Sequence, residues 1–127
     1  MLRTSHFAAI CTLFLSFAPF GSAHADGVMI QHAMGETEVK KDPKTVAVLD
    51  VSALDTLYAI GVDVQGVPND IFVPYLHKFD GPEYRKVGSV FEPDYEALSA
   101  MAPDLIIVGG RSSPKYPEVS KIGPTID

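Results

Sequence analysis

Arg111 is the residue of this sequence whose type and setting best suit ligand chemistry. It follows Gly109 and Gly110, directly after the most strand-like stretch of the chain, residues 105–108. A guanidinium group is planar, permanently charged and rich in donors, so it pairs well with carboxylate, catecholate or phosphate oxygens. Because ligands of open parallel sheets bind beyond the carboxyl ends of the strands, this position predicts a site for an anionic ligand. The alternative is a solvated loop arginine.

The other polar residues form no recognisable catalytic motif. His32 and His77 are isolated in the sequence, which favours surface or hydrogen-bonded histidines over metal ligands. Asp50 and Asp55 are better placed to cap a helix than to act as an acid–base pair. The Ser112–Ser113 pair lacks the flanking glycines of a nucleophile elbow, and the sequence has no dinucleotide or phosphate-loop fingerprint. We therefore expect no catalytic residues, no metal ligands and no enzyme activity.

Residues 1–25 have the three parts of an export signal. Arg3 precedes an apolar run at 7–20, and Ala23-His24-Ala25 forms a small-x-small cleavage site. The run is shorter than the ~20 residues of a spanning helix, so a cleaved signal is favoured over a retained anchor. Cys11, the only cysteine, lies inside the run, which disfavours a lipoprotein. The sequence thus predicts a soluble periplasmic protein that does not span the membrane.

Composition limits the remaining chain, residues 26–127, to one small domain. The formal charge of the whole sequence is −6, so there is no basic excess for binding nucleic acid. Hydrophobic residues make up 46% of the sequence and charged residues 20%, which is typical of a globular domain rather than a disordered chain.

The first half of this domain reads as a hairpin followed by a strand–helix–strand unit. Residues 28–39 alternate loosely, which predicts the hairpin, and 45–49 form a continuous β-prone run. Ser52 is expected to begin a helix that ends at Gly61, and 64–67 read as the second strand. This order of elements predicts a parallel sheet with right-handed crossovers.

A second unit follows a loop-rich segment, residues 68–90, that is expected to include a short packed helix. Residues 94–101 predict a helix and 105–108 a strand, and a weak helix is expected at 116–122. Residues 124–126 read as the beginning of another strand. The predicted fold class is therefore α/β, a parallel sheet with flanking helices, in a chain expected to be truncated.

Taken in order, several segments carry a resemblance to a known family. They are Thr45-Val-Ala-Val-Leu-Asp50, Ala53-Leu-Asp-Thr-Leu57, Phe91-Glu-Pro-Asp-Tyr-Glu96, Ala102-Pro-Asp-Leu-Ile-Ile107, Gly110-Arg-Ser-Ser113 and Ile122-Gly-Pro-Thr-Ile126. The sequence resembles the first lobe of periplasmic iron–siderophore binding proteins, the solute receptors of ATP-driven (ABC) importers, and in particular the catecholate-associated branch.

The resemblance implies a receptor with two α/β lobes joined by one long helix, of which this chain holds the first lobe, 26–127. An Fe(III)–siderophore complex would lie between the lobes, with no covalently bound cofactor. Arg111 and Tyr116 match residues that reach the ligand, and Ser52 and Phe91 are further candidates at the cleft. Glu96 matches a glutamate that docks to the membrane permease. Tyr116 is equally well explained by helix packing, and Glu96 by its place in a first helical turn.

Two other functions remain open at this point. One is a receptor for haem, cobalamin or a metal ion on the same fold, although a bare-metal site needs converging histidines and carboxylates. The other is a small exported enzyme with a flavodoxin-like sheet, which needs a phosphate-binding loop or a catalytic dyad.

Overall fold

The structure is a computed structural model that describes residues 27–127. The predicted export signal at 1–25, with Cys11, lies outside the described residues. In chain order the elements are β1 (Gly27–His32), β2 (Gly35–Lys40), β3 (Val46–Val48), α1 (Val51–Ala59), β4 (Gly66–Val67), the 3₁₀ helix η1 (Pro74–Asp80), β5 (Arg85–Lys86), α2 (Tyr95–Met101), β6 (Leu105–Ile107), the 3₁₀ helix η2 (Gly110–Lys115), α3 (Tyr116–Val119) and β7 (Thr125–Ile126).

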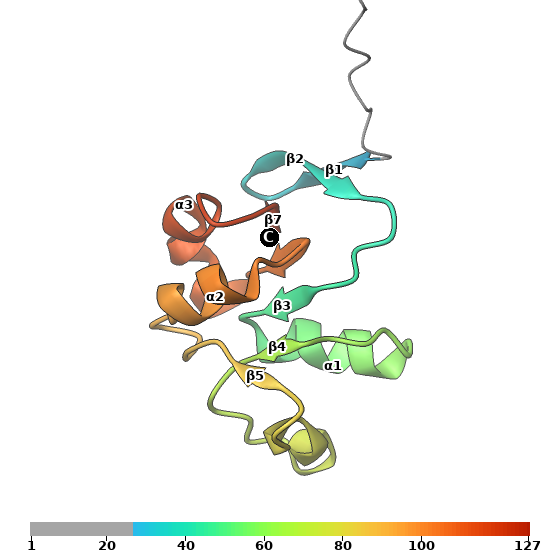
Figure 1. The fold of residues 1–127 in the computed structure, drawn as a ribbon, viewed down its shortest axis with the longest axis vertical. Helices are drawn as coiled ribbons and strands as arrows, with labels where there is room; N and C mark the ends of the chain where they lie inside the picture. Colours follow the sequence, from blue (N-terminus) through green and yellow to red (C-terminus); the bar gives the residue numbers. More distant parts are fainter. Residues whose placement is uncertain (1–26) are drawn as a thin grey trace, which may run out of the picture.

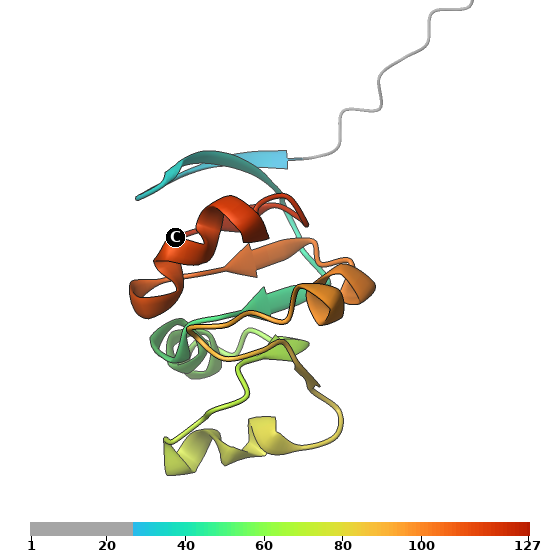
Figure 2. The ribbon, with the colours of Figure 1, turned by 90° about the vertical axis from the view of Figure 1, so that its left-hand side faces the viewer.

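Five strands form one sheet in the order β5-β4-β3-β6-β7, and every neighbouring pair is parallel. The central strand β3 is buried along its whole length because helices cover both of its faces. Val46 and Val48 pack with Leu54 of α1, whereas Ala47 packs with Leu98 of α2 and with α3 on the other face. Figures 1 and 2 show the layers. The predicted α/β class is confirmed.

The helices α1 and α2 each begin with an aspartate as the N-cap residue. The Asp50 carboxylate accepts a hydrogen bond from the amide of Ala53 at 2.8 Å, and Asp94 caps α2 by accepting from Ala97 at 2.9 Å. The prediction that α1 begins at Ser52 is wrong, because Asp50 satisfies the free amides two residues earlier. Gly61, with φ of +75°, follows the end of α1 as predicted.

The segment between β4 and α2 contains the expected packed helix and one unexpected strand. In η1, Leu76 and Phe79 are buried, and the Phe79 ring meets the ring of Tyr84 edge-on at 4.8 Å. The strand β5 escaped prediction because Arg85 and Lys86 carry no β-type pattern. These residues form a strand because they pair with β4, and not because of their own sequence pattern.

The predicted hairpin, β1 and β2, packs at the outer end of the sheet. The Thr37 hydroxyl donates a hydrogen bond to the Thr125 carbonyl of β7 at 2.8 Å. His32 Nε2 lies 2.9 Å from the Thr37 hydroxyl, while His77 is exposed on η1. Both histidines are therefore hydrogen-bonded or on the surface, as predicted.

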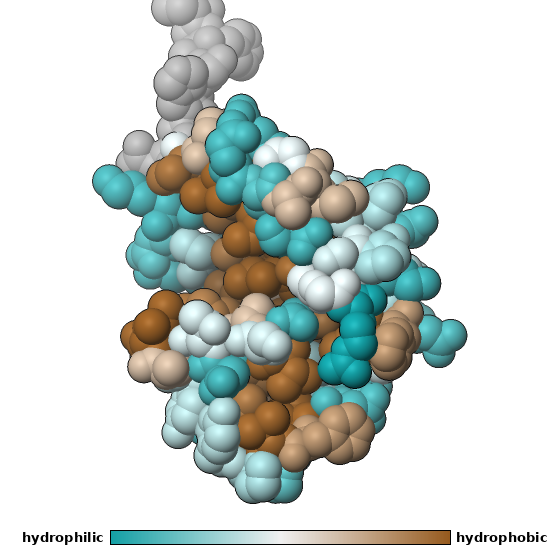
Figure 3. Space-filling model, turned by 180° about the vertical axis from the view of Figure 1, so that it is seen from behind, coloured by the Kyte–Doolittle hydropathy of each residue, from teal (hydrophilic) through white to brown (hydrophobic). Residues whose placement is uncertain are grey.

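One face of the sheet is only partly covered. On β6, Ile106 is fully buried under α2 and α3, whereas Leu105 and Ile107 point to the α1 side and are half-buried. Ile126 of β7 pairs with Ile107 and is also half-buried. Seen from behind, apolar side chains form a continuous stripe down the middle of the molecule (Figure 3).

Candidate ligand-binding site

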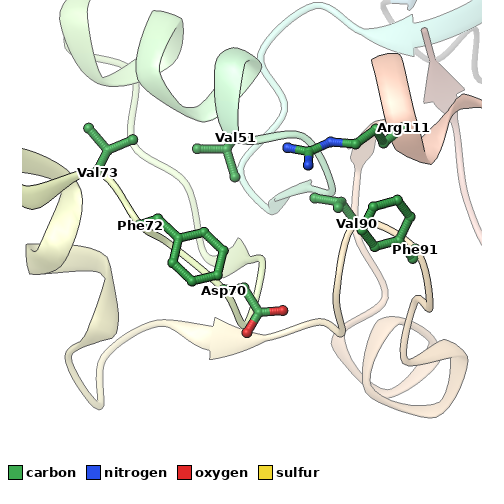
Figure 4. A pocket seen from close by; sticks show the side chains of 7 residues that line it. All are labelled: Val51, Asp70, Phe72, Val73, Val90, Phe91 and Arg111. Atoms are coloured by element: carbon green, nitrogen blue, oxygen red, sulfur yellow. The ribbon is translucent and has the colours of Figure 1, made fainter.

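A hollow of about 220 Å³ opens at the carboxyl edge of the sheet. Its lining comes from the start of α1, the segment after β4, the loop before α2, and η2. The lining residues are Val51, Asp70, Phe72, Val73, Val90, Phe91 and Arg111 (Figure 4). The carboxyl edge is where the sequence predicts a ligand in a parallel sheet, and the hollow combines apolar walls with one residue of each charge.

Arg111 is positioned by the turn that joins β6 to η2. Gly110 adopts φ of +51°, a left-handed conformation that most side chains disfavour, and the chain then enters η2 with Arg111 exposed. The guanidinium extends over the hollow toward Val51 (Figure 4). None of the ion pairs within residues 27–127 involves Arg111. The predicted location of Arg111 at the carboxyl edge is confirmed.

Phe91 lies beside this guanidinium. The Arg111 Cζ atom is 5.5 Å from the centre of the Phe91 ring, within the range of a cation–π contact worth about 0.5–1 kcal/mol at an exposed site. Phe91 is 57% exposed. Because solvent reaches both groups, a ligand can displace that water and contact the ring and the charge together.

The loop that carries Phe91 is held by its own hydrogen bonds. The Ser89 hydroxyl accepts from the amides of Phe91 and Glu92, at 3.2 and 2.9 Å. Gly88 has φ of +95°, and a Cβ atom there would lie 2.3 Å from the Asp94 amide nitrogen. Only glycine fits at that position, so the turn fixes the place at which Phe91 leaves the loop.

Asp70 and Phe72 line the hollow from the segment after β4. Phe72 is 84% exposed, and Asp70 is exposed and takes part in none of the ion pairs within residues 27–127. Neither residue was a candidate from the sequence. The available signal was the position after the strand end at Pro68-Asn69, which is itself a carboxyl edge.

Two predicted ligand residues do not line this hollow. Ser52 is exposed in the first turn of α1, next to Val51, and its carbonyl accepts from the Thr56 hydroxyl. Tyr116 is half-buried in α3, with its ring 5.5 Å from the His32 ring. Tyr116 also packs against the apolar cluster under α2 and α3. The structure thus brings Arg111 and Phe91 together, while Ser52 and Tyr116 lie outside the lining.

Glu96 lies in the first turn of α2 and is exposed. It lines a second, more open depression together with Arg85, Asp94, Ala97 and Ala100. No ion pair within the described chain uses its carboxylate. Glu96 is therefore accessible to a partner from outside the chain.

The described residues also limit the chemistry of this chain. Within 27–127, no group of three or more His, Cys, Asp or Glu side chains converges as a metal site. No helix in the same range is long and apolar enough to cross a membrane. The arrangement at the hollow is suited to holding a molecule that offers anionic oxygens and flat apolar surfaces.

Comparison with known proteins gives consistent matches in sequence and structure. The petrobactin-binding protein YclQ of Bacillus subtilis is 43% identical over 103 residues, which cover 78% of this chain and 32% of the relative. The crystal structure of YclQ superposes with a TM-score of 0.75, covering 79% of this chain and 36% of that one. A scan against protein-family models finds no match.

Two further solved structures agree with this match. The periplasmic catecholate-siderophore binding protein VctP from Vibrio cholerae is 40% identical, with a TM-score of 0.74, over 79% of this chain and 36% of that one. The siderophore-binding protein BauB, solved with ferric iron and two molecules of acinetobactin, is 34% identical with a TM-score of 0.73, at the same coverage of both chains.

Over 78–79% of its own length, the chain is therefore similar to siderophore-binding proteins of ABC importers. It spans about a third of the length of the relatives, and its fold corresponds to one lobe of the periplasmic binding protein fold. The relatives are binding proteins of transporters and not enzymes, so the flavodoxin-like enzyme finds no support.

Proposed function

We propose that the hollow at the carboxyl edge is one side of a binding site for an anionic ferric siderophore, in a receptor that delivers this complex to an ABC permease. The observation that carries the proposal is the free guanidinium of Arg111, held beside the exposed ring of Phe91. The matched relatives named for siderophores supply the ligand class.

The charge of the ligand fits this pair of residues. In a catecholate complex the phenolate charges outnumber those of the ferric ion, so the outside of the complex is anionic and aromatic. Arg111 offers a permanent positive charge with several donors, and Phe91 offers a face against which a catechol ring can pack. The iron is already saturated by the siderophore, so this side of the site needs no metal ligand from the protein.

The size of the hollow indicates that the ligand is only partly enclosed here. Its volume of about 220 Å³ is below the ~300–1,000 Å³ of pockets that bury a drug-sized ligand. We propose that a second lobe covers the opposite side of the ligand in the complete receptor. This chain alone is then expected to bind ferric siderophores more weakly than a two-lobed protein does.

The remaining site assignments belong to the same proposal. Tyr116 and Ser52 are kept as ligand residues only for a siderophore that extends beyond the hollow toward the hairpin or along α1. Glu96, exposed on α2, is proposed to dock on the permease. Residues 1–25 are proposed as a cleaved signal that directs the chain to the periplasm.

Equilibrium dialysis against ferric catecholate complexes, read from their visible absorbance, tests the proposal. Replacing Arg111 by Ala removes a charge-assisted contact and is expected to weaken binding about tenfold. Arg85→Ala is the matched control, because Arg85 is also an exposed arginine but lies outside the hollow. Equal affinities for the wild type and the Arg111→Ala variant would contradict the proposal.

A further inference from the structure

The hollow contains two opposite charges that do not pair with each other. The ion pairs within residues 27–127 join Lys40 to Asp104, Lys44 to Asp42, and Lys86 to Asp80. Arg111 and Asp70 line the same cavity without forming one. Both residues are exposed, and Figure 4 shows the Arg111 guanidinium and the Asp70 carboxylate apart from each other around the hollow.

The backbone around Asp70 is anchored on both sides. The amide of Asn69 donates a hydrogen bond to the Gly88 carbonyl at 2.9 Å, which ties the segment to the loop before α2. Ile71 is only 6% exposed and packs into the apolar cluster under α1. Asp70 therefore stays at the wall of the hollow, across from Arg111 (Figure 4).

An aromatic ring accompanies each of the two charges. Phe91 lies beside the Arg111 guanidinium, and Phe72 follows Asp70 by two residues and lines the same wall. A carboxylate together with an aromatic face is the combination that recognises an alkylammonium group, through a charge-assisted hydrogen bond and a cation–π contact. The hollow thus has an end suited to anions and an end suited to cations.

A purely anionic chelate is not the best ligand for this arrangement. Its outer oxygens gain from Arg111 but are repelled by the carboxylate of Asp70, because like charges disfavour one another at short range. A chelate with a protonated amine on one arm converts that repulsion into attraction. The second charge therefore discriminates between ferric complexes of similar size and shape.

We propose that Asp70, assisted by Phe72, makes this site selective for ferric siderophores that carry a protonated amine. The anionic iron-binding end of such a ligand lies against Arg111 and Phe91, and its ammonium group lies against Asp70 and Phe72. This inference rests on the proposed function, because it assigns the ligand chemistry of the same site.

Two synthetic probes that differ in one atom test this selectivity. In each, three dihydroxybenzamide groups saturate the ferric ion, and a flexible side arm that takes no part in iron binding contains a secondary amine in one probe and a methylene at the same position in the other. The wild-type chain is expected to bind the ferric amine probe about threefold more tightly, as for a solvent-exposed ion pair. In Asp70→Asn the preference is expected to fall to about one, and the methylene probe is expected to bind more tightly than to the wild type.

Two further variants complete the test. Asp63→Asn removes the same charge from an exposed loop outside the hollow and is expected to keep the wild-type preference. Phe72→Leu removes the ring without changing the charge and is expected to lower the preference in part. If Asp70→Asn does not fold, as judged by its thermal unfolding, Phe72→Leu decides the question.

The failure of this inference differs from the failure of the proposed function. Equal wild-type affinities for the two probes, or an unchanged preference in Asp70→Asn, overturn the role of Asp70 while siderophore binding at Arg111 stands. Binding of neither ferric probe by the wild-type chain overturns the proposed function, and the assignment of Asp70 with it.

Discussion

The two edges of the sheet use charged residues in opposite ways. At the amino edge, Asp104 precedes β6 and accepts hydrogen bonds from the Lys40 ammonium, the Lys44 amide at 2.9 Å and the Thr45 amide at 3.2 Å. At the carboxyl edge, Arg111 and Asp70 line a cavity, and neither forms an ion pair within the described chain. Paired charges hold strands together, whereas charges left without partners at a concave surface are available to a ligand.

The aromatic residues repeat this contrast. Phe79 is 2% exposed and meets the Tyr84 ring edge-on, so its area contributes to the core. Phe72 and Phe91 are 84% and 57% exposed at the carboxyl edge, where they contribute little to folding. Exposed aromatic rings beside unpaired charges therefore distinguish the proposed binding surface from the structural core.

Truncating the buried ring of Phe79 is expected to lower stability more than any other substitution considered. Phe79→Ala is expected to lower the free energy of unfolding by about 3–5 kcal/mol, because it leaves a cavity beneath η1. Phe91→Ala is its matched control and is expected to change stability by less than about 0.5 kcal/mol while weakening ligand binding. Urea unfolding of both variants measures the difference, and a similar loss for both would break the contrast.

The next prediction concerns the geometry of the guanidinium. Arg111→Lys keeps the charge but loses the planar set of donors and the flat contact with Phe91. We expect affinity for ferric catecholate complexes to fall about threefold to tenfold, between wild type and the alanine variant. Equilibrium dialysis of the wild type, Arg111→Lys and Arg111→Ala checks this order of affinities. A lysine variant that equals the wild type would show that charge alone is sufficient.

At the amino edge, Asp104 is expected to stabilise the fold in a pH-dependent manner. The Lys40 ammonium, together with the Lys44 and Thr45 amides, holds the pKa of Asp104 below its usual value. A lowered pKa contributes stability above the ordinary pKa of an aspartate, and this contribution is lost as the pH falls through the folded value. Asp104→Asn should therefore be less stable than wild type near neutral pH, with a smaller difference near pH ~2.

Urea midpoints of the wild type and Asp104→Asn at both pH values check this sign. A difference in urea midpoint between the two proteins that grows as the pH falls would contradict the predicted sign. Asp42→Asn is a suitable control, because the ion pair that Asp42 makes within residues 27–127 is with Lys44, and both side chains are highly exposed.

How far the sequence predicts this molecule depends on whether a feature is local. The hairpin, the strands around 46 and 105, and the helix at 94–101 follow from patterns of residues near in sequence, and all are present. The strand β5 and the wall formed by Asp70 and Phe72 depend on which segments the fold brings together. The position of Arg111 at the carboxyl edge could be predicted because two glycines directly after a clear strand indicate where that strand ends.

Replacing Glu96, which takes part in none of the ion pairs within the described chain, is expected to change the properties of this protein least. Glu96→Gln is expected to change unfolding free energy by less than about 0.5 kcal/mol and to leave ferric-chelate affinity unchanged, because the side chain is exposed and outside the hollow. If Glu96 docks on the permease, Glu96→Gln is expected to lower only the stimulation of the importer's ATPase activity. A Glu96→Gln receptor that stimulates the importer as well as wild type would remove docking from the proposal.

Amide chemical-shift mapping can show directly whether the hollow binds a ferric siderophore. A catecholate complex of Ga(III), a diamagnetic substitute for Fe(III), can be titrated into the isotope-labelled chain. We expect shifts that cluster at Asp70–Val73, Val90–Phe91 and Arg111, around the hollow. Shifts confined to the hairpin β1–β2, or no shifts at the highest soluble ligand concentration, would contradict a binding site at the hollow.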